Sequence, residues 1–253
     1  MPSHADRILD QFTRQAVPFS AAAAIRNEDA LARIVRLAEA GADDTVLDVA
    51  CGPGLLACAF APVVRHVTGI DVTPAMLDQA RALERAKGLG NITWDIAEVP
   101  PLPYPGGRFS IVTCRFSFHH MIDPLAVLQE MRRVCAPGGR VVVADLTPHA
   151  AKAADFNAAE KVRDPSHTRA MPLEELGELF QRAGLHILRT ESYRLAGEME
   201  DLLSRSFPEP GGADRLRRLY AESIEGDVLG MEMRRDGEQL RFGMPVSAIA
   251  GQA

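Results

Sequence analysis

Cysteine and long apolar runs are scarce in this sequence, and their scarcity excludes several classes of protein. The four cysteines are Cys51, Cys58, Cys114 and Cys135, and none forms a C-x-x-C pair. This spacing fits no disulfide framework and no zinc site, so we expect buried free thiols and no metal centre. No window approaches the roughly 18 apolar residues of a membrane span, and residues 1–7 lack the apolar core of a secretory signal. We therefore expect a cytoplasmic protein without integral membrane contact.

Positive charge is also in deficit. The chain carries 28 Lys and Arg against 34 Asp and Glu, a formal net charge of −6, and no run of five basic residues occurs. Because neutralising phosphates requires a basic face, we expect no nucleic-acid partner. The 253 residues, of which 47% are hydrophobic, suit one soluble domain with a modest extension. Monomer and homodimer both remain open.

Short apolar runs alternate with amphipathic segments along most of the chain. The predicted strands span residues 45–50, 64–70, 91–97, 109–115, 140–146, 185–195 and 240–250, and the clearest predicted helices span 28–40, 73–87 and 172–183, with another beginning at 123. Nearly continuous apolar strands separated by helices are typical of a parallel sheet covered on both faces. The sequence therefore predicts an α/β fold with a mostly parallel, seven-stranded sheet.

A glycine-rich loop follows the first predicted strand. Residues 51–54 read Cys-Gly-Pro-Gly, and Ala57 completes a G-x-G-x-x-G/A pattern before a helix. Glycine allows the backbone to approach a ligand closely, and the helix start offers free N–H groups. Alone, the loop admits any nucleotide-like ligand, including NAD, or a tight turn without a ligand.

Three acids narrow the choice of ligand. Asp71 ends the second predicted strand, where an acid can accept hydrogen bonds from a ribose diol, and Asp95 ends the third. Asp48 lies inside the first strand, where a charge is costly unless it is satisfied. Dinucleotide dehydrogenases normally have an apolar residue at that point, whereas a cationic ligand, or nearby backbone N–H groups, would justify Asp48. Because ligands of open parallel sheets bind outside the carboxyl ends of the strands, all three acids should converge.

With these residues in place, the sequence resembles the class I S-adenosylmethionine (AdoMet)-dependent methyltransferases. More narrowly, it is similar to the group of ubiquinone/menaquinone-biosynthesis C-methyltransferases and natural-product methyltransferases. The resemblance covers about residues 40–147 and rests on five ordered segments: residues 46–54, 69–77, 95–98, 115–120 and 128–139. It implies a Rossmann-like sheet whose last strand is antiparallel, with helices on both faces and a helical cap. Residues 98–104 depart from the family by one additional residue.

The resemblance also implies a place for each part of AdoMet. Gly52 and Gly54 pack under the methionine part, Asp48 lies near its amino group, and Asp71 binds the ribose hydroxyls. Asp95 accepts from the adenine amino group. The complete implied cofactor set is Asp48, Ala50, Cys51, Gly52, Gly54, Asp71, Val72, Met76, Asp95, Ile96, Arg115 and Phe116.

Two histidines follow the fourth predicted strand, on the side where the acceptor is expected. A histidine near its ordinary pKa could take a proton from a phenol, amine or enol as the methyl group transfers. We take His120 as the stronger candidate for this base and His119 as the second; packing against the next helix is the alternative for either. Phe12 and Phe19 belong to an N-terminal segment that we expect either to fold over the methyl group as a lid or to dock as a helix.

The sequence therefore predicts one methyltransferase domain, residues 1–253. It comprises a lid (1–26), an AdoMet-binding core (27–147), a cap that selects the acceptor (148–230) and a terminal strand (231–253). The expected acceptor is a small molecule of biosynthetic or secondary metabolism, methylated on C, O or N. An NAD-dependent oxidoreductase is disfavoured by Asp48 and Asp95 and by the lack of a hydride-transfer motif. A protein that binds AdoMet without catalysis is the remaining alternative.

Overall fold

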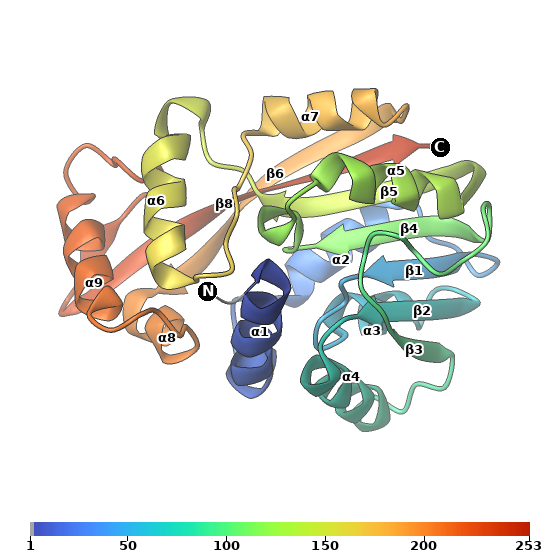
Figure 1. Cartoon of the computed structure of the whole chain (residues 1–253), viewed down its shortest axis with the longest axis horizontal. Coiled ribbons are helices and arrows are strands. Elements are labelled where there is room, and N and C mark those ends of the chain that lie inside the picture. Colours follow the sequence, from blue (N-terminus) through green and yellow to red (C-terminus); the bar gives the residue numbers. More distant parts are fainter. Residues whose placement is uncertain (1–2) are drawn as a thin grey trace.

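The structure, a computed structural model, describes residues 3–253; Met1 and Pro2, which begin the expected lid, lie outside the described residues. One sheet runs through this part of the chain in the order β3-β2-β1-β4-β5-β8-β6, with β7 paired to β8 (Figure 1). The strands are β1 (Thr45–Val49), β2 (His66–Asp71), β3 (Ile92–Ile96), β4 (Phe109–Arg115), β5 (Cys135–Leu146), β6 (His186–Glu198), β7 (Arg234–Asp236) and β8 (Gln239–Gln252).

The direction of the strands confirms the predicted fold class. β1 to β5 pair in parallel, whereas β8 runs antiparallel to both β5 and β6, between which it lies. The unpredicted strand is β7, which forms a hairpin with β8. Its three residues are polar and exposed, so they carry no apolar alternation that sequence reading could detect.

Helices cover both faces of the sheet. They are α1 (His4–Ala21), α2 (Glu28–Leu37), α3 (Leu55–Phe60), α4 (Pro74–Ala86), α5 (Pro124–Val134), α6 (Ala153–Arg163), α7 (Leu173–Arg182), α8 (Met199–Ser204) and α9 (Gly212–Glu222), with short 3₁₀ turns at Phe118–His120 and Ala150–Lys152. Side-chain caps fix two of the starts: Asn27 accepts from the Ala30 N–H (2.9 Å) and Asp123 from the Ala126 N–H (3.0 Å). Among residues 3–253, no helix has the length and apolar character needed to cross a membrane.

Alternate residues of the strands build two separate cores. Leu47 and Val49 pack in one core with side chains of α5 and α7, whereas Val46 packs in the other with side chains of α2 and α3. Burial on both faces explains why the central strands read as continuous apolar runs. It also leaves the ends of the strands as the place where polar side chains can gather.

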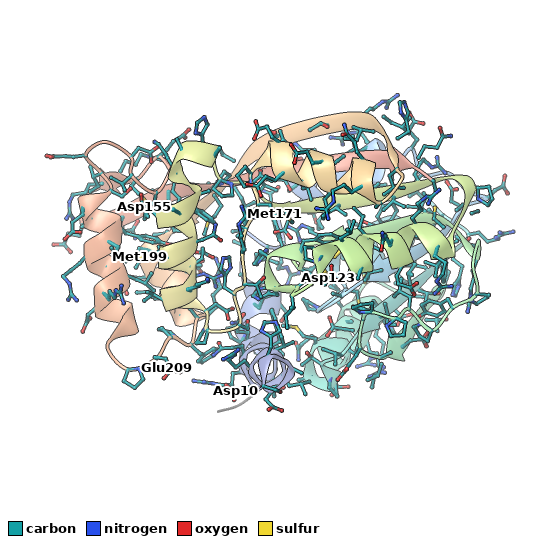
Figure 2. The ribbon with its side chains drawn as sticks, turned by 45° about the horizontal axis from the view of Figure 1, so that its top comes forward. Asp10, Asp123, Asp155, Met171, Met199 and Glu209 are labelled. Carbon is teal, nitrogen blue, oxygen red and sulfur yellow. The ribbon has the colours of Figure 1, made fainter. Side chains whose placement is uncertain are left out.

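A third core lies beyond one end of the sheet, where α6, α8 and α9 group together (Figure 1). It contains Phe156 of α6 and Tyr220 of α9, and the extended ends of β6 and β8 add Leu195 and Phe242. In Figure 2, Asp10 on α1 lies between Met199 of this group and Asp123 at the start of α5.

The expected cap, residues 148–230, is divided in the structure. α7 packs in the core with α5, and β6 pairs with β8 along most of its length, so both belong to the sheet domain. The residues outside it are two segments, 148–171 and 199–230, which hold α6, α8 and α9. A strand and a helix of the sheet domain therefore interrupt the cap in sequence.

Candidate functional site

A cavity of about 370 Å³ opens at the carboxyl ends of β1, β2 and β4. Helix α1 contributes to its wall as well. Of the residues predicted from the sequence, those that line it are Phe12, Phe19, Asp48, Ala50, Cys51, Gly52, Asp71, Val72, Met76, Arg115, Phe116 and His120. Most of the predicted residues thus lie together at the carboxyl edge of the parallel sheet, which is where ligands of such sheets bind.

The backbone turns sharply at the residues that directly follow β1 and β4. Ala50 has φ 52° and Phe116 has φ 56°, values uncommon for residues with a side chain, and Gly52 has φ 53°. A left-handed conformation at a non-glycine residue costs on the order of 1–3 kcal/mol and tends to occur at functional sites. Both strained residues line the cavity.

Asp48 is a buried acid with unfilled hydrogen-bonding capacity. It is 1% exposed, and its Oδ2 has no hydrogen-bond partner within residues 3–253. Burial raises the pKa of Asp48 to about 7, although the backbone N–H of Ala57 and the charge of Arg115 act in the opposite direction. A cationic group in the cavity would supply the missing partner and favour the ionised carboxylate. The amino group of AdoMet fits this requirement.

Asp71 joins the glycine loop to the second strand. Its Oδ2 accepts from the Gly52 N–H and its Oδ1 from the Thr73 N–H, both at 2.8 Å. Burial raises the pKa of Asp71. Each carboxylate oxygen can accept a second hydrogen bond, so the residue can hold a pair of hydroxyl groups on the cavity side. That arrangement fits a ribose diol.

Four predicted site residues do not line this cavity. Asp95 accepts from the Tyr104 hydroxyl through Oδ2 (2.7 Å), and Ile96 is 57% exposed. A Cβ on Gly54 would come within 2.6 Å of the Trp94 ring on β3 and 2.8 Å of Ala80 Cβ on α4, so this glycine allows the start of α3 to pack closely against both elements. His119 lies elsewhere and is described below.

The cavity wall after β3 comes instead from the next residues of the chain, Ala97 to Pro100. Three of these residues lie in the stretch 98–104, where the sequence departs from the family pattern by one additional residue, and that departure is the signal that could have found them. The wall also includes Ile8 and Ile25, for which we find no signal in the sequence.

A second, smaller cavity of about 70 Å³ lies beside the first. The two cavities share five wall residues: Phe12, Phe19, Ile25, Phe116 and His120. The rest of the smaller cavity is formed by α6, α8, other residues of α1 and the ends of β5, β6 and β8. The two cavities therefore adjoin along these mostly aromatic side chains.

His119 faces the second cavity and is held by an acid on the neighbouring strand. It is 5% exposed, its Nδ1 pairs with Asp145 Oδ1, and its backbone N–H donates to Asp145 Oδ2 at 3.2 Å. With Nδ1–H directed at the carboxylate, Nε2 is the nitrogen left to accept a proton. Asp145 was not predicted from the sequence. The signal was present, because Asp145 is a charge inside an apolar strand, as Asp48 is.

His120 contacts both cavities but has a different environment. Ser166 Oγ donates to Asp164 Oδ1 (2.5 Å), so it accepts from His120 Nδ1–H (3.1 Å). Burial lowers the pKa of His120 to about 3. The Phe12 ring packs against it edge-on, with centroids 5.0 Å apart. At neutral pH His120 is therefore a neutral wall residue of low basicity.

Comparison with known proteins agrees with this geometry. The methyltransferase domain family matches residues 46–139. The uncharacterized methyltransferase YcgJ of Bacillus subtilis is 28% identical over 230 residues, which are 87% of this chain and 89% of YcgJ. A putative methyltransferase from Bacillus halodurans has a similar structure, with a TM-score of 0.81 at 26% identity, over 88% of this chain and 98% of that one.

A more local similarity extends to an enzyme with a named activity. The demethylmenaquinone methyltransferase of Deinococcus radiodurans is 43% identical over 108 residues, which are 42% of this chain and 44% of that enzyme. The fold and the site define an AdoMet-dependent methyltransferase. Residues 46–139 of the chain belong to the methyltransferase domain family.

Proposed function

We propose that the enzyme holds AdoMet in the larger cavity and methylates a small molecule that enters the smaller one. The observation that carries this proposal is the wall of five residues that the two cavities share. Methyl transfer requires donor and acceptor to meet in line at a short distance. In this proposal the two molecules meet through an opening between the five shared side chains.

Within the larger cavity, we assign a part of the cofactor to each of five predicted residues. Asp48 pairs with the amino group, Gly52 leaves room for the methionine part, and Asp71 binds the ribose hydroxyls. Val72 and Met76 flank the adenine. When bound, AdoMet supplies a methyl group that its sulfonium has already activated. The remaining work of the protein is to align the acceptor, exclude water and receive a proton where the acceptor has one to lose.

We assign the proton-accepting role to His119, with Asp145 as the residue that positions it. The Nδ1 contact with Asp145 fixes the ring and stabilises the imidazolium formed when Nε2 takes a proton. His120, our stronger candidate from the sequence, has a pKa lowered to about 3, which makes it a weak base. The acceptor is therefore a nucleophile that carries an exchangeable proton, such as a phenol, an amine or an enol.

The experiment is incubation with labelled AdoMet and a panel of phenolic, quinone-precursor, amine and polyketide-like acceptors, followed by mass analysis. With the best acceptor, His119→Asn should lower kcat by about 10²–10⁴-fold. The Kd for AdoMet should not change. His120→Asn is the matched control, for which we expect a smaller loss. A larger loss in His120→Asn would contradict the assignment.

The position of the acceptor is tested separately by filling the smaller cavity. Ala24 and Ala196 line this cavity and not the larger one. Ala24→Leu and Ala196→Leu should raise the KM for the acceptor and leave the Kd for AdoMet, measured by calorimetry, unchanged. An unaltered KM in both variants would place the acceptor elsewhere.

A further inference from the structure

The smaller cavity has an apolar side and a polar end. Leu195, Phe242 and Met244 form part of the apolar side, from β6 and β8. Glu160 of α6 and Arg205, directly after α8, belong to the polar end. Charged side chains are rarely buried without a partner, so the hydrogen bonds at this end indicate what a ligand must supply.

The two carboxylates at the polar end, Asp164 and Glu160, differ in whether both of their oxygens have hydrogen-bond partners. Asp164 is satisfied, because Oδ1 accepts from Ser166 and Oδ2 from Gln15 (3.1 Å). Glu160, only 1% exposed, uses a single oxygen: Oε2 accepts from Arg163 Nε (2.9 Å) and Nη2 (2.7 Å). Its Oε1 is buried and has no partner within the part of the chain that the structure describes. The cavity therefore offers an acceptor that needs a donor.

Arg205 has the opposite requirement. It is 8% exposed, and in residues 3–253 its side-chain hydrogen bond runs from Nε to Asp201 (3.3 Å), which leaves the two Nη groups without an acceptor. Burial and the charge of Arg163 lower the pKa of Arg205. In the described chain, Arg205 and Glu160 form no ion pair with each other. A ligand group that both donates and accepts would satisfy the two side chains together.

We propose that Glu160 and Arg205 select an acceptor that carries a hydroxyl group at a distance from the atom that is methylated. The hydroxyl donates to Glu160 Oε1 and accepts from Arg205, while the apolar body of the molecule lies against Leu195, Phe242 and Met244. A hydrogen atom in place of the hydroxyl would leave Glu160 Oε1 unpaired. A carboxylate would place a third negative charge beside Glu160 and Asp164. This inference rests on the proposed function, because it takes the smaller cavity as the acceptor site.

The test uses three matched probes: phenol, toluene and benzoate. Their binding to the protein saturated with S-adenosylhomocysteine is measured by ligand-observed NMR. We expect phenol to bind at least tenfold more tightly than toluene or benzoate, since sites built around a hydroxyl reject analogues that lack it. Similar affinity for phenol and toluene, a preference for benzoate, or no detectable binding of phenol would overturn the inference.

Two variants assign the preference to the residues. Glu160→Gln and Arg205→Gln should each remove most of the tenfold difference between phenol and toluene, and Glu178→Gln on the exposed face of α7 should retain it. Retention of the difference in both Glu160→Gln and Arg205→Gln overturns the inference. Ala196→Leu separates the two proposals. If it weakens the binding of phenol and toluene alike, the cavity is the acceptor site, whether or not the hydroxyl is selected there.

Discussion

At the scale of single residues, the site is organised around acids that the apolar sheet cannot satisfy. Asp48 and Asp145 are both almost completely buried in parallel strands. Asp145 has a partner in His119, whereas Asp48 Oδ2 has none within residues 3–253. A buried polar atom without a partner costs about 1–3 kcal/mol, more for a charged group. We therefore interpret Asp48 as a group whose partner arrives with the cofactor.

The pKa of Asp48 determines how the stability of the folded protein and its affinity for a cationic ligand change with pH. Its value is raised from 3.8 to about 7 by burial, so the folded, cofactor-free protein holds a proton that the unfolded chain releases. The contribution of Asp48 to stability is present below pH 3.8 and is lost as the pH rises through about 7. A cationic ligand favours the ionised carboxylate, so its affinity should rise over the upper part of the same range.

Asp48→Asn should therefore weaken AdoMet binding in a pH-dependent way. At pH 8 we expect a Kd about 10–100-fold higher than that of the wild type, because a hydrogen bond to a charged group contributes roughly 1.5–3 kcal/mol. At pH 6 the difference should shrink, since the wild-type carboxyl is then largely protonated. Calorimetry at pH 6, 7 and 8 measures the ratio of the Kd of Asp48→Asn to the Kd of the wild type. The ionisation of AdoMet itself cancels in this ratio. A ratio that stays constant across this range would contradict the role of Asp48.

At the scale of secondary-structure elements, α1 connects the two cavities to the cap. His4 Nε2 pairs with the backbone oxygen of His120 (2.7 Å), Gln15 donates to Asp164 (3.1 Å), and Gln11 donates to the backbone oxygen of Phe207 (3.2 Å). Phe12 and Phe19 on the same helix form part of the shared wall. Of the two expectations for this segment, the structure shows a docked helix whose residues line both cavities. The function of this helix as a lid stays a prediction.

Deletion of residues 1–20 should raise the Kd for AdoMet by roughly tenfold, corresponding to about 1.4 kcal/mol. The deletion removes Phe12 and Phe19 from the wall and opens the larger cavity to water. Phe12→Ala should show part of this loss. Val17→Ala, on the same helix but 64% exposed, is the control and should bind as the wild type does. An unchanged Kd after the deletion would show that α1 is not part of the cofactor site.

The sequence predicted correctly those helices and strands whose apolar residues recur at a regular spacing. The strands that bear Asp48 and Asp71 are apolar on both faces, and the glycine loop between a strand and a helix fixed their shared edge. Helix α6 was not predicted, because its buried residues are Phe156, Ala159 and Glu160, which form no apolar stripe. Glu160 therefore could not be assigned to the site from sequence. Its partners in the smaller cavity come from segments whose meeting depends on tertiary packing.

At the scale of the whole molecule, the two cavities differ in the parts of the chain that form them, and in the proposed function the sheet holds the cofactor and the cap surrounds the acceptor. The larger cavity is built from strand ends and α1, whereas Glu160, Leu202 and Arg205 of the smaller one come from the cap segments. The cap packs around Phe156 and Tyr220 in an apolar core to which Leu195 of β6 and Phe242 of β8 also belong. The cap segments can therefore be exchanged with little effect on the rest of the sheet, provided that α7, β6 and β8 are left in place.

Exchange of residues 148–171 and 199–230 for the corresponding segments of YcgJ should change the choice of acceptor. The Kd for AdoMet should stay within about threefold, less than 1.4 kcal/mol, because none of the exchanged residues lines the larger cavity. Labelled AdoMet with the acceptor panel measures the first effect and calorimetry the second. Exchange of the whole range 148–230 is the informative comparison: it also replaces α7 and β6, so it should lower the thermal stability, which the two-segment exchange should largely preserve. Loss of AdoMet affinity in the two-segment exchange, with the fold intact, would show that the cap takes part in holding the cofactor.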